Sequence, residues 1–230
     1  MKFEPLIETA PLSVKKESPM AEHLYTYVDP VSERDMKKAI AVLENDGILA
    51  YPLDSNWAFG CDASSVKALD KIRRLKPTHP KDQPFSLICA DMAMAASIGN
   101  VDNNHYRILK KAWPGPYTVI LTRHKSLARQ IKDKRPVVGI KVPESRLICE
   151  LVTRLGKPIA TTSVPRRSEG EPFKMGYEIA EEFGHGLDLI LDLGEELPGL
   201  DSTIIDFTDV EPVLVRAGVG DPKLFGVSAS

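Results

Sequence analysis

The sequence predicts an α/β fold in a single domain, in which helices pack on a twisted mixed sheet. The chain has 230 residues, 43% hydrophobic and 27% charged, which is enough for one sizeable core. Helical and strand-like periodicities alternate along it. Strand patterns outnumber helical ones towards the C-terminus, and no regular βαβ repeat closes into eight units, which disfavours a TIM barrel.

The first predicted helix covers residues 31–47, and the residues at both of its ends support it. Ser32 is a candidate N-cap and Gly47 is a C-terminal stop. Between them, apolar side chains recur at helical spacing, at Met36, Ala39, Ile40 and Leu43. We therefore expect one face of this helix to pack on the sheet.

The remaining elements follow in alternation. A second helix begins after Ser64 or Ser65. The helices after the first are expected over residues 64–76, 105–113 and 144–156. The strands are expected over residues 48–52, 84–89, 117–122, 137–142, 158–161, 187–193, 202–207 and 212–217.

The N-terminal stretch is a poor folding segment. It lacks the apolar core of a signal peptide and has three glutamates, which a mitochondrial presequence avoids. It also contains Pro5, Pro11 and Pro19. We expect a disordered tail over 1–22, a folded domain over 23–226 and a short tail over 227–230. An alternative interpretation is that Met20 is the first residue of the compact protein.

The composition disfavours several classes of protein. No stretch approaches about 18 consecutive apolar residues, so no membrane span is expected. The net charge of −2 means that any RNA contact needs a local basic patch. Three widely spaced cysteines predict neither a disulfide framework nor a zinc cage, in keeping with a reducing cytoplasmic location. No P-loop pattern occurs, so a phosphate contact must be made in another way.

Five fragments stand in one order along the chain: YPLDSNWAFGCDA, LKPTHPKDQPFSLI, WPGPYTVILT, KPIATTSVP and DSTIIDFTDVEPVLVRAGVGD. In sequence and in order they resemble the YrdC/YciO family, which is related to threonylcarbamoyl-adenylate synthases. The resemblance runs from about residue 30 to about residue 225. It implies a YrdC-like α/β domain with a concave, positively lined ligand cavity.

The same resemblance implies a nucleotidyltransferase activity. Such an enzyme forms threonylcarbamoyl-AMP and pyrophosphate from L-threonine, bicarbonate and ATP, and the product feeds the threonylcarbamoyladenosine modification of tRNA. ATP is then a substrate, and Mg²⁺ bridges its phosphates without a dedicated protein cage. No covalent nucleophile is needed, since catalysis rests on positioning and charge stabilisation. Some relatives are described as binding double-stranded RNA, so double-stranded RNA or tRNA is a further expected partner.

The resemblance also implies the residues that hold L-threonine. The family motif Y-P-T-[DE]-T-x-Y-G-L starts here at Tyr51 and places Ser55 at a hydroxyl that holds the amino acid. Thr161 and Ser202 fall on further threonine-binding positions. An alternative is an ordinary turn, in which Asp54 or Ser55 only satisfies backbone donors.

The implied ATP-binding residues are Lys76, His79, Gln83, Thr118, Ser163 and Arg216. The family pattern K-x-R-P-x-x-N-P brings two cations and an amide to the phosphates. This chain departs from it, with one extra residue, His79 at the arginine and Gln83 at the asparagine. Pro165 also replaces the asparagine of the S-x-N pattern, and Lys81 is an alternative cation. Because histidine is mostly neutral at pH 7, we expect weakened activity.

Arg216 is the strongest ATP ligand by its position in the sequence. It ends a predicted strand before a glycine turn, where ligand arginines often lie, and a buried arginine needs an anion. The alternative is an ion pair with Asp206 or Asp221. Lys141, where many relatives carry arginine in G-x-R-V-P, is a weaker candidate.

Two other functions remain open for the same fold. The first is carbamoyl transfer to a different amine, which a test of amine specificity distinguishes. The second is a nucleotide- or double-stranded-RNA-binding module without synthase activity. RNA binding with a steep salt dependence and no pyrophosphate release would support that second function.

Overall fold

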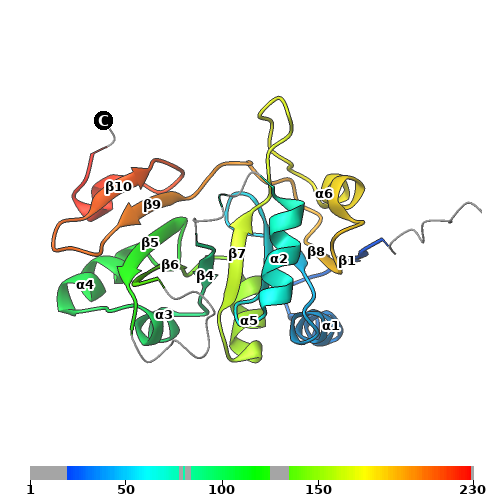
Figure 1. Cartoon of the computed structure of the whole chain (residues 1–230), viewed down its shortest axis with the longest axis horizontal. Coiled ribbons are helices and arrows are strands. Elements are labelled where there is room, and N and C mark those ends of the chain that lie inside the picture. Colours follow the sequence, from blue (N-terminus) through cyan, green and yellow to red (C-terminus); the bar gives the residue numbers. More distant parts are fainter. Residues whose placement is uncertain (1–19, 78–79, 81–83, 125–134, 229–230) are drawn as a thin grey trace, which may run out of the picture.

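The computed structural model describes residues 20–77, 80, 84–124 and 135–228, and a ten-stranded twisted sheet runs through them (Figure 1). The strands are β1 (Glu22–Tyr25), β2 (Leu49–Pro52), β3 (Trp57–Asp62), β4 (Ser86–Ile88), β5 (Tyr117–Thr122), β6 (Val137–Lys141), β7 (Ile159–Ser163), β8 (Leu189–Asp192), β9 (Thr203–Asp206) and β10 (Val213–Arg216). Their order in the sheet is β1-β8-β2-β3-β7-β4-β6-β5-β9-β10.

Six helices pack against this sheet, which confirms the predicted α/β fold class. They are α1 (Glu33–Glu44), α2 (Val66–Leu75), α3 (Met92–Ile98), α4 (Asn103–Ala112), α5 (Arg146–Leu155) and α6 (Gly176–Phe183), and a 3-10 helix, η2, follows at Pro222–Phe225. None of the helices in the described part of the chain has both the length and the apolar composition needed to cross a membrane.

The sheet is mixed, as predicted. Strand pairs β1–β8, β2–β8, β4–β6 and β5–β9 are parallel, and the other neighbours are antiparallel. The central strand β3 is buried at every position. Residues 193–202 join β8, second in the sheet order, to β9, ninth in that order, so this segment crosses most of the width of the sheet (Figure 1).

Two hydrophobic cores lie on opposite faces of the sheet. Along β2, Ala50 belongs to one core while Leu49 and Tyr51 belong to the other, because successive side chains of a strand point to opposite faces. Helices α1 and α5 contribute to the second core, and α2, α3, α4 and α6 to the first. The two layers of helices leave the strand ends free to carry polar side chains.

The helix caps agree with the sequence. The Ser32 hydroxyl accepts a hydrogen bond from the Asp35 backbone N–H, at 3.4 Å. Helix α2 begins after Ser65, whose Oγ accepts from Ala68 N at 3.0 Å, whereas Ser64 donates to Asp62. The predicted set did not include β1, β3, α3, α6 or the 3-10 helix η2.

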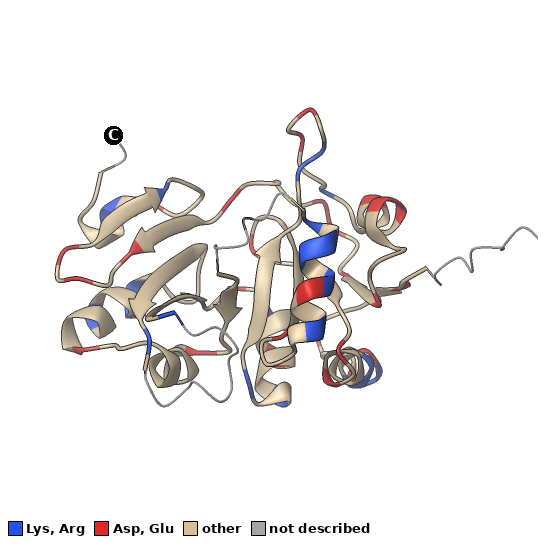
Figure 2. Cartoon of the chain, viewed as in Figure 1, with Lys and Arg blue, Asp and Glu red and all other residues tan. Residues whose placement is uncertain are grey.

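Charged side chains are spread over many elements of the fold (Figure 2). Lysine and arginine on α2 stand beside acidic groups, as in the ion pairs of Arg73 with Asp70 and of Lys71 with Asp188. This mixture fits the net charge of −2. A positive field for a ligand must therefore come from a local cluster.

Candidate functional site

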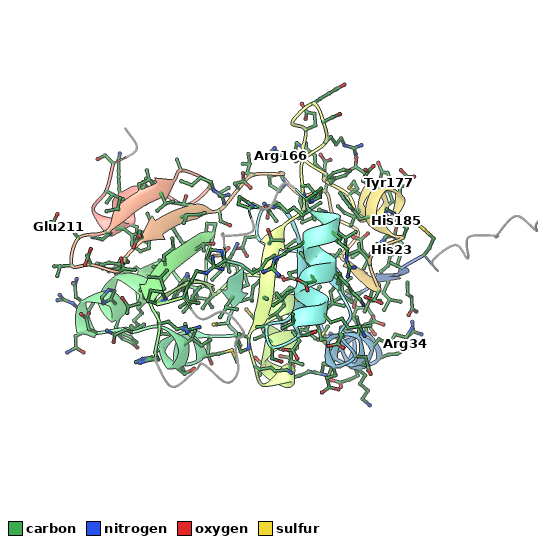
Figure 3. The ribbon with its side chains drawn as sticks, viewed as in Figure 1. His23, Arg34, Arg166, Tyr177, His185 and Glu211 are labelled. Atoms are coloured by element: carbon green, nitrogen blue, oxygen red, sulfur yellow. The ribbon has the colours of Figure 1, made fainter. Side chains whose placement is uncertain are left out.

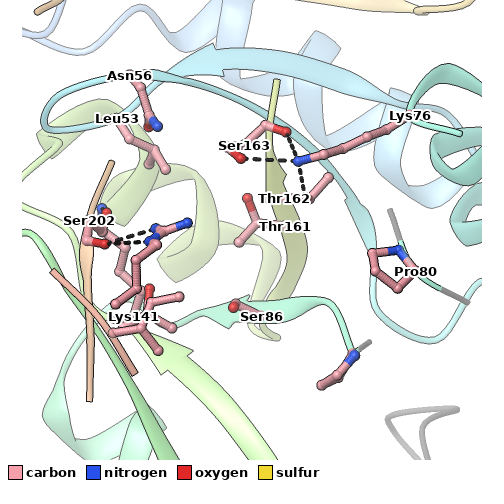
Figure 4. Close-up of a pocket in the computed structure, with 14 residues that line it drawn as sticks. Leu53, Asn56, Lys76, Pro80, Ser86, Lys141, Thr161, Thr162, Ser163 and Ser202 are labelled. Carbon is pink, nitrogen blue, oxygen red and sulfur yellow. Dashed lines mark hydrogen bonds between the residues drawn. The ribbon is translucent and has the colours of Figure 1, made fainter. Parts of the chain in front are cut away.

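A cavity of about 230 Å³ opens where the turn between β2 and β3 meets the ends of several strands (Figure 4). Six of its lining residues were predicted from the sequence, namely Lys76, Thr118, Thr161, Ser163, Ser202 and Arg216. Other lining residues are Leu53, Asn56, Ser86, Lys141, Thr162 and Ile204. Strands far apart in the sequence thus bring the predicted side chains to one place.

Three predicted residues are not seen at the cavity. Ser55 is only 2% exposed, and its hydroxyl donates to the Leu200 carbonyl at 2.8 Å. The Ser55 carbonyl in turn accepts from the backbone N–H groups of Gly199 and Leu200. In the structure Ser55 therefore anchors the crossing segment 193–202 to the β2–β3 turn. The other two, His79 and Gln83, lie outside the described residues, as does the alternative cation Lys81.

Lys76 reaches the cavity from the C-terminal end of α2 (Figure 4). Its Nζ donates to the Ser163 carbonyl at 2.7 Å and to Ser163 Oγ and Thr162 Oγ1 at 3.1 Å. All three acceptors are neutral, and within the described residues Lys76 has no ion pair. Burial lowers the pKa of Lys76 to about 8; the Arg216 charge also lowers it, and the Asp201 carboxylate opposes both effects. The ammonium is therefore ready to be stabilised by an anion.

Arg216 is held by a backbone carbonyl at the end of β10. Its Nε and Nη2 donate to the Ser202 carbonyl at 3.2 and 2.8 Å. The sequence left Asp206 and Asp221 open as ion-pair partners of Arg216, but both have other partners. Asp206 accepts hydrogen bonds from Thr208, and Asp221 accepts one from the Lys223 backbone. Across the described ranges Arg216 forms no ion pair, and the structure does not show the alternative pairing.

Lys141 is the buried cation of the cavity, and sequence reasoning ranked it too low. It is the last residue of β6 and is only 2% exposed. Its Nζ lies 2.9 Å from Asp54 Oδ2 and donates to Ser202 Oγ at 2.9 Å. Burial lowers the pKa of Lys141, and the Asp54 carboxylate opposes this effect. The signal in the sequence is a lysine that ends an otherwise apolar strand, VVGIK.

One oxygen of the Asp54 carboxylate satisfies backbone donors, as expected for an ordinary turn, and the other oxygen does not. Its Oδ1 accepts from the backbone N–H groups of Glu144 and Ser145, at 2.8 and 3.3 Å. The other oxygen, Oδ2, faces Lys141. The β2–β3 turn is therefore bound to the backbone before α5 through Asp54 Oδ1. Through Asp54 Oδ2 it contacts Lys141, which lines the cavity.

The Thr161 hydroxyl is oriented by two protein partners. It accepts from the Tyr51 hydroxyl at 2.8 Å and donates to the Phe59 carbonyl at 3.2 Å. Its one proton is therefore used, and a hydroxyl oxygen has two lone pairs. Thr161 can offer a ligand only an acceptor.

Ser163 and Ser202, in contrast to Thr161, can donate a hydrogen bond to a ligand. Ser163 Oγ accepts from Lys76, and Ser202 Oγ accepts from Lys141, so the proton of each hydroxyl is free to be donated. Together with the three cations, these groups make a wall rich in donors. Such a wall suits anionic oxygen atoms, and Thr161 adds an acceptor that suits an amine.

The rim of the cavity is tied to the crossing segment. Asn56 donates to Asp201 at 3.3 Å, and Arg166 lies 3.6 Å from the same carboxylate. Arg166, labelled in Figure 3, belongs to the loop after β7 and also donates to the Gly199 carbonyl at 3.1 Å. In the structure Arg166 binds the crossing segment 193–202 and does not line the cavity.

No group of three or more histidine, cysteine, aspartate or glutamate side chains in the described residues has the arrangement of a metal site. Asp54, the carboxylate in contact with the lining residue Lys141, is paired with that lysine.

The chain is similar to many known proteins. The family model Sua5_yciO_yrdC, described as telomere recombination, matches residues 41–218. YciO of Escherichia coli, described as uncharacterized, is 33% identical over 211 residues, which cover 90% of this chain and 100% of YciO. The crystal structure of E. coli YciO superposes with a TM-score of 0.80 at 32% identity, over 90% of this chain and 100% of that one.

Synthases are also among the relatives. The threonylcarbamoyl-AMP synthase of Bacillus subtilis is 29% identical over 198 residues, covering 83% of this chain and 56% of the synthase. The structure of Pyrococcus abyssi Sua5 complexed with L-threonine superposes with a TM-score of 0.71 at 24% identity, over 86% of this chain and 57% of that one. The shared part is thus one domain of these longer proteins.

Proposed function

This chain belongs to the Sua5/YciO/YrdC family, which includes threonylcarbamoyl-AMP synthases, and on that premise we propose that it is an ATP-dependent nucleotidyltransferase of that type. It joins L-threonine, bicarbonate and ATP, and it releases pyrophosphate. The adenylate product then serves the threonylcarbamoyladenosine modification of tRNA. The proposal concerns the domain shared with the synthases, since the chain matches 56% of the B. subtilis enzyme.

One observation carries the proposal. Lys76 and Arg216 line the same cavity, and their hydrogen-bond acceptors among the described residues are all neutral oxygens. Cations held on carbonyl and hydroxyl groups keep their charge available for a ligand, and phosphates are the strongest biological partners for such charges. We assign this part of the wall, with Thr118 and Ser163, to the nucleotide.

A second part of the wall, next to Arg216, supports an amino-acid subsite. Lys141 has a third N–H beyond its contacts with Asp54 and Ser202, and the Ser202 hydroxyl proton is free. These donors suit the substrate carboxylate. The lone pair of Thr161 suits the substrate amine, because Thr161 can only accept. Ser55 acts through the turn that it anchors.

The chemistry consists of two substitutions. The amine of threonine attacks the carbon of bicarbonate, a C–N bond forms, and water leaves. A carbamate oxygen then attacks the α-phosphorus of ATP, an O–P bond forms, and the bond to the oxygen of the β-phosphate breaks with its electron pair on pyrophosphate. Fixed positive charge from Lys76 and Arg216 stabilises the charge that develops on the leaving group. Mg²⁺ accompanies the phosphates, and no step is assigned to it.

The decisive experiment is pyrophosphate release from ATP and bicarbonate, measured with and without L-threonine. We expect threonine-dependent release that Arg216→Ala and Lys76→Met slow by ~10²-fold or more. Arg34→Ala and Lys71→Met are matched controls, since both residues lie outside the cavity, and we expect them to leave the rate unchanged.

Three results would contradict the proposal in different ways. Pyrophosphate release that does not depend on L-threonine but depends on another amine would show that the proposed substrate is wrong and that the proposed reaction type is right. Binding of ATP or RNA without any release would show a binding module. Equal rates for the cavity variants and their controls would show that this cavity is not the site.

A further inference from the structure

Asp54 lies just behind the wall of the cavity, where its buried carboxylate meets the Lys141 ammonium. We propose that Asp54 is the positioning residue of the amino-acid subsite, because its carboxylate holds the Lys141 ammonium against Ser202 and turns the third N–H into the cavity. This inference rests on the proposed function. It assigns a role to a residue that does not itself line the cavity.

The first argument concerns the freedom of the lysine side chain. Four rotatable bonds separate the ammonium of a lysine from its backbone, so the strand alone does not aim it. An ion-pair contact at 2.9 Å to Asp54 Oδ2 and a hydrogen bond at 2.9 Å to Ser202 Oγ hold the Lys141 nitrogen on two sides. The ammonium held between them lies at the cavity, which Lys141 lines.

The second argument concerns how Asp54 itself is fixed. Its Oδ1 accepts from two backbone N–H groups, those of Glu144 and Ser145, directly before α5. The Ser145 side chain does not cap this helix and donates instead to the Pro52 carbonyl, at 3.4 Å. Asp54 therefore supplies the negative charge at the N-terminus of α5, which favours a carboxylate. The backbone directly before α5 thus determines where the carboxylate lies.

The third argument concerns charge. Both side chains are almost fully buried, at 3% and 6% exposure for Lys141 and Asp54. An ammonium buried at such a site without a carboxylate loses much of its solvation and is destabilised. Without Asp54, the Lys141 ammonium would keep the Ser202 hydroxyl and the weaker attraction of Glu144, against its burial and the repulsion of Arg216. The carboxylate is therefore needed for the ammonium to stay charged and in place.

The test compares three variants in the pyrophosphate assay. Asp54→Asn keeps an oxygen for the backbone N–H groups of Glu144 and Ser145 but removes the charge. We expect the L-threonine concentration for half-maximal rate to rise at least ~10-fold and that for ATP to change less than ~2-fold. Asp54→Glu, which the family motif allows, restores most of the threonine affinity.

Asp62→Asn is the matched control. Asp62 is also buried, also accepts from a backbone N–H, that of Ser64, and also pairs with a lysine, Lys157, but it does not line or approach the cavity wall. We expect this variant to leave both half-saturation values unchanged. If the L-threonine concentration for half-maximal rate is the same in Asp54→Asn as in Asp62→Asn, the positioning role is overturned.

A second measurement separates this inference from the proposed function. In urea melts, Asp54→Asn combined with Lys141→Met should be less destabilised than the sum of the single variants, since the two groups are in contact. Additive effects would show that the pair does not form. If the unmodified protein neither binds L-threonine nor uses it, the proposed function is wrong and the positioning role fails with it. If Asp54→Asn does not fold, Asp54→Ser, which also removes the charge, takes its place, and an L-threonine concentration for half-maximal rate equal to that of Asp62→Asn would overturn the positioning role.

Discussion

Hydrogen bonds inside the cavity give each hydroxyl a fixed role. Thr161 uses its proton on Phe59 and receives one from Tyr51, so it only accepts. Ser163 and Ser202 each receive a lysine N–H and keep a proton to donate. A serine or threonine in isolation has no such preference. The preference of Thr161 for an amine and of the two serines for anionic oxygen therefore comes from the neighbours of each hydroxyl.

Lys76 should make nucleotide binding depend on pH. Its pKa in the free protein is about 8, and bound phosphates favour the ammonium, so ATP binding takes up a proton near and above this pH. We expect ATP affinity to fall as the pH rises through about 8. Calorimetry in buffers of different ionisation enthalpy measures the proton uptake. Lys76→Arg, which stays charged, should flatten the profile, and an unchanged profile would contradict the assignment.

The same pKa has a consequence for stability with a definite sign. The folded pKa of Lys76 is lowered from 10.5 to about 8, so between these values the unfolded chain binds more protons than the folded one. The contribution of Lys76 to the free energy of unfolding should therefore rise with pH across this window. Urea melts of the wild type and Lys76→Met at several pH values measure this difference.

At the scale of secondary structure, the strongly periodic elements were predictable and the others were not. Helix α1 has a cap and an apolar face in its sequence, and it forms as expected. The strand β3 was missed because its apolar run follows a polar turn directly, and α3 has only seven residues. Strand β1 is a short edge strand with a mostly polar sequence, EHLY. Its position depends on pairing with β8, more than 160 residues away, which no local pattern encodes.

A prediction at this scale concerns the contact between β2, β3 and β7. A Cβ on Gly60 would lie 2.5 Å from the Tyr51 hydroxyl oxygen and 2.9 Å from Ile159 Cγ2. Gly60→Ala should therefore lower the free energy of unfolding by ~1–3 kcal/mol through overpacking. Tyr51→Leu removes this oxygen and also the ring carbon Cε1, which would lie 2.6 Å from the new Cβ, so the double variant should lose less than the sum of the two changes. Additive losses in urea melts would contradict this close approach.

At the scale of the whole molecule, the cavity is built from residues 53 to 216 of the chain. Motif order was enough to predict six of its lining residues, since those residues stand in recognisable fragments. It was not enough to rank Lys141 correctly or to place Ser55, because both depend on contacts with distant segments. Lys141 needs Asp54, and Ser55 needs Leu200. Such contacts are properties of the folded chain only.

The order of the strands in the sheet also predicts which strands exchange their amide hydrogens fastest. Strands β1 and β10 each have one neighbour, and β10 is largely exposed, whereas β3 and β7 lie at the centre of the sheet. We expect amide hydrogen exchange to be fastest in β1 and β10 and slowest in β3 and β7. ATP and L-threonine together should slow exchange in β9 and β10, which carry part of the site. Equal protection of β10 and β3 in the free protein would contradict this order.

The segment that crosses the sheet has a kinetic consequence. Strand β9 pairs in parallel with β5, so Thr203 must find Tyr117 only after residues 193–202 have passed from one side of the sheet to the other. Pairings between residues so distant in sequence form late, because the entropy of the intervening loop is lost before the contact stabilises it. Ser202 and Arg216 therefore join the cavity last. During synthesis, a nascent chain can therefore build much of its core before its cavity is complete, because Ser202 and Arg216 leave the ribosome after the strands that they join.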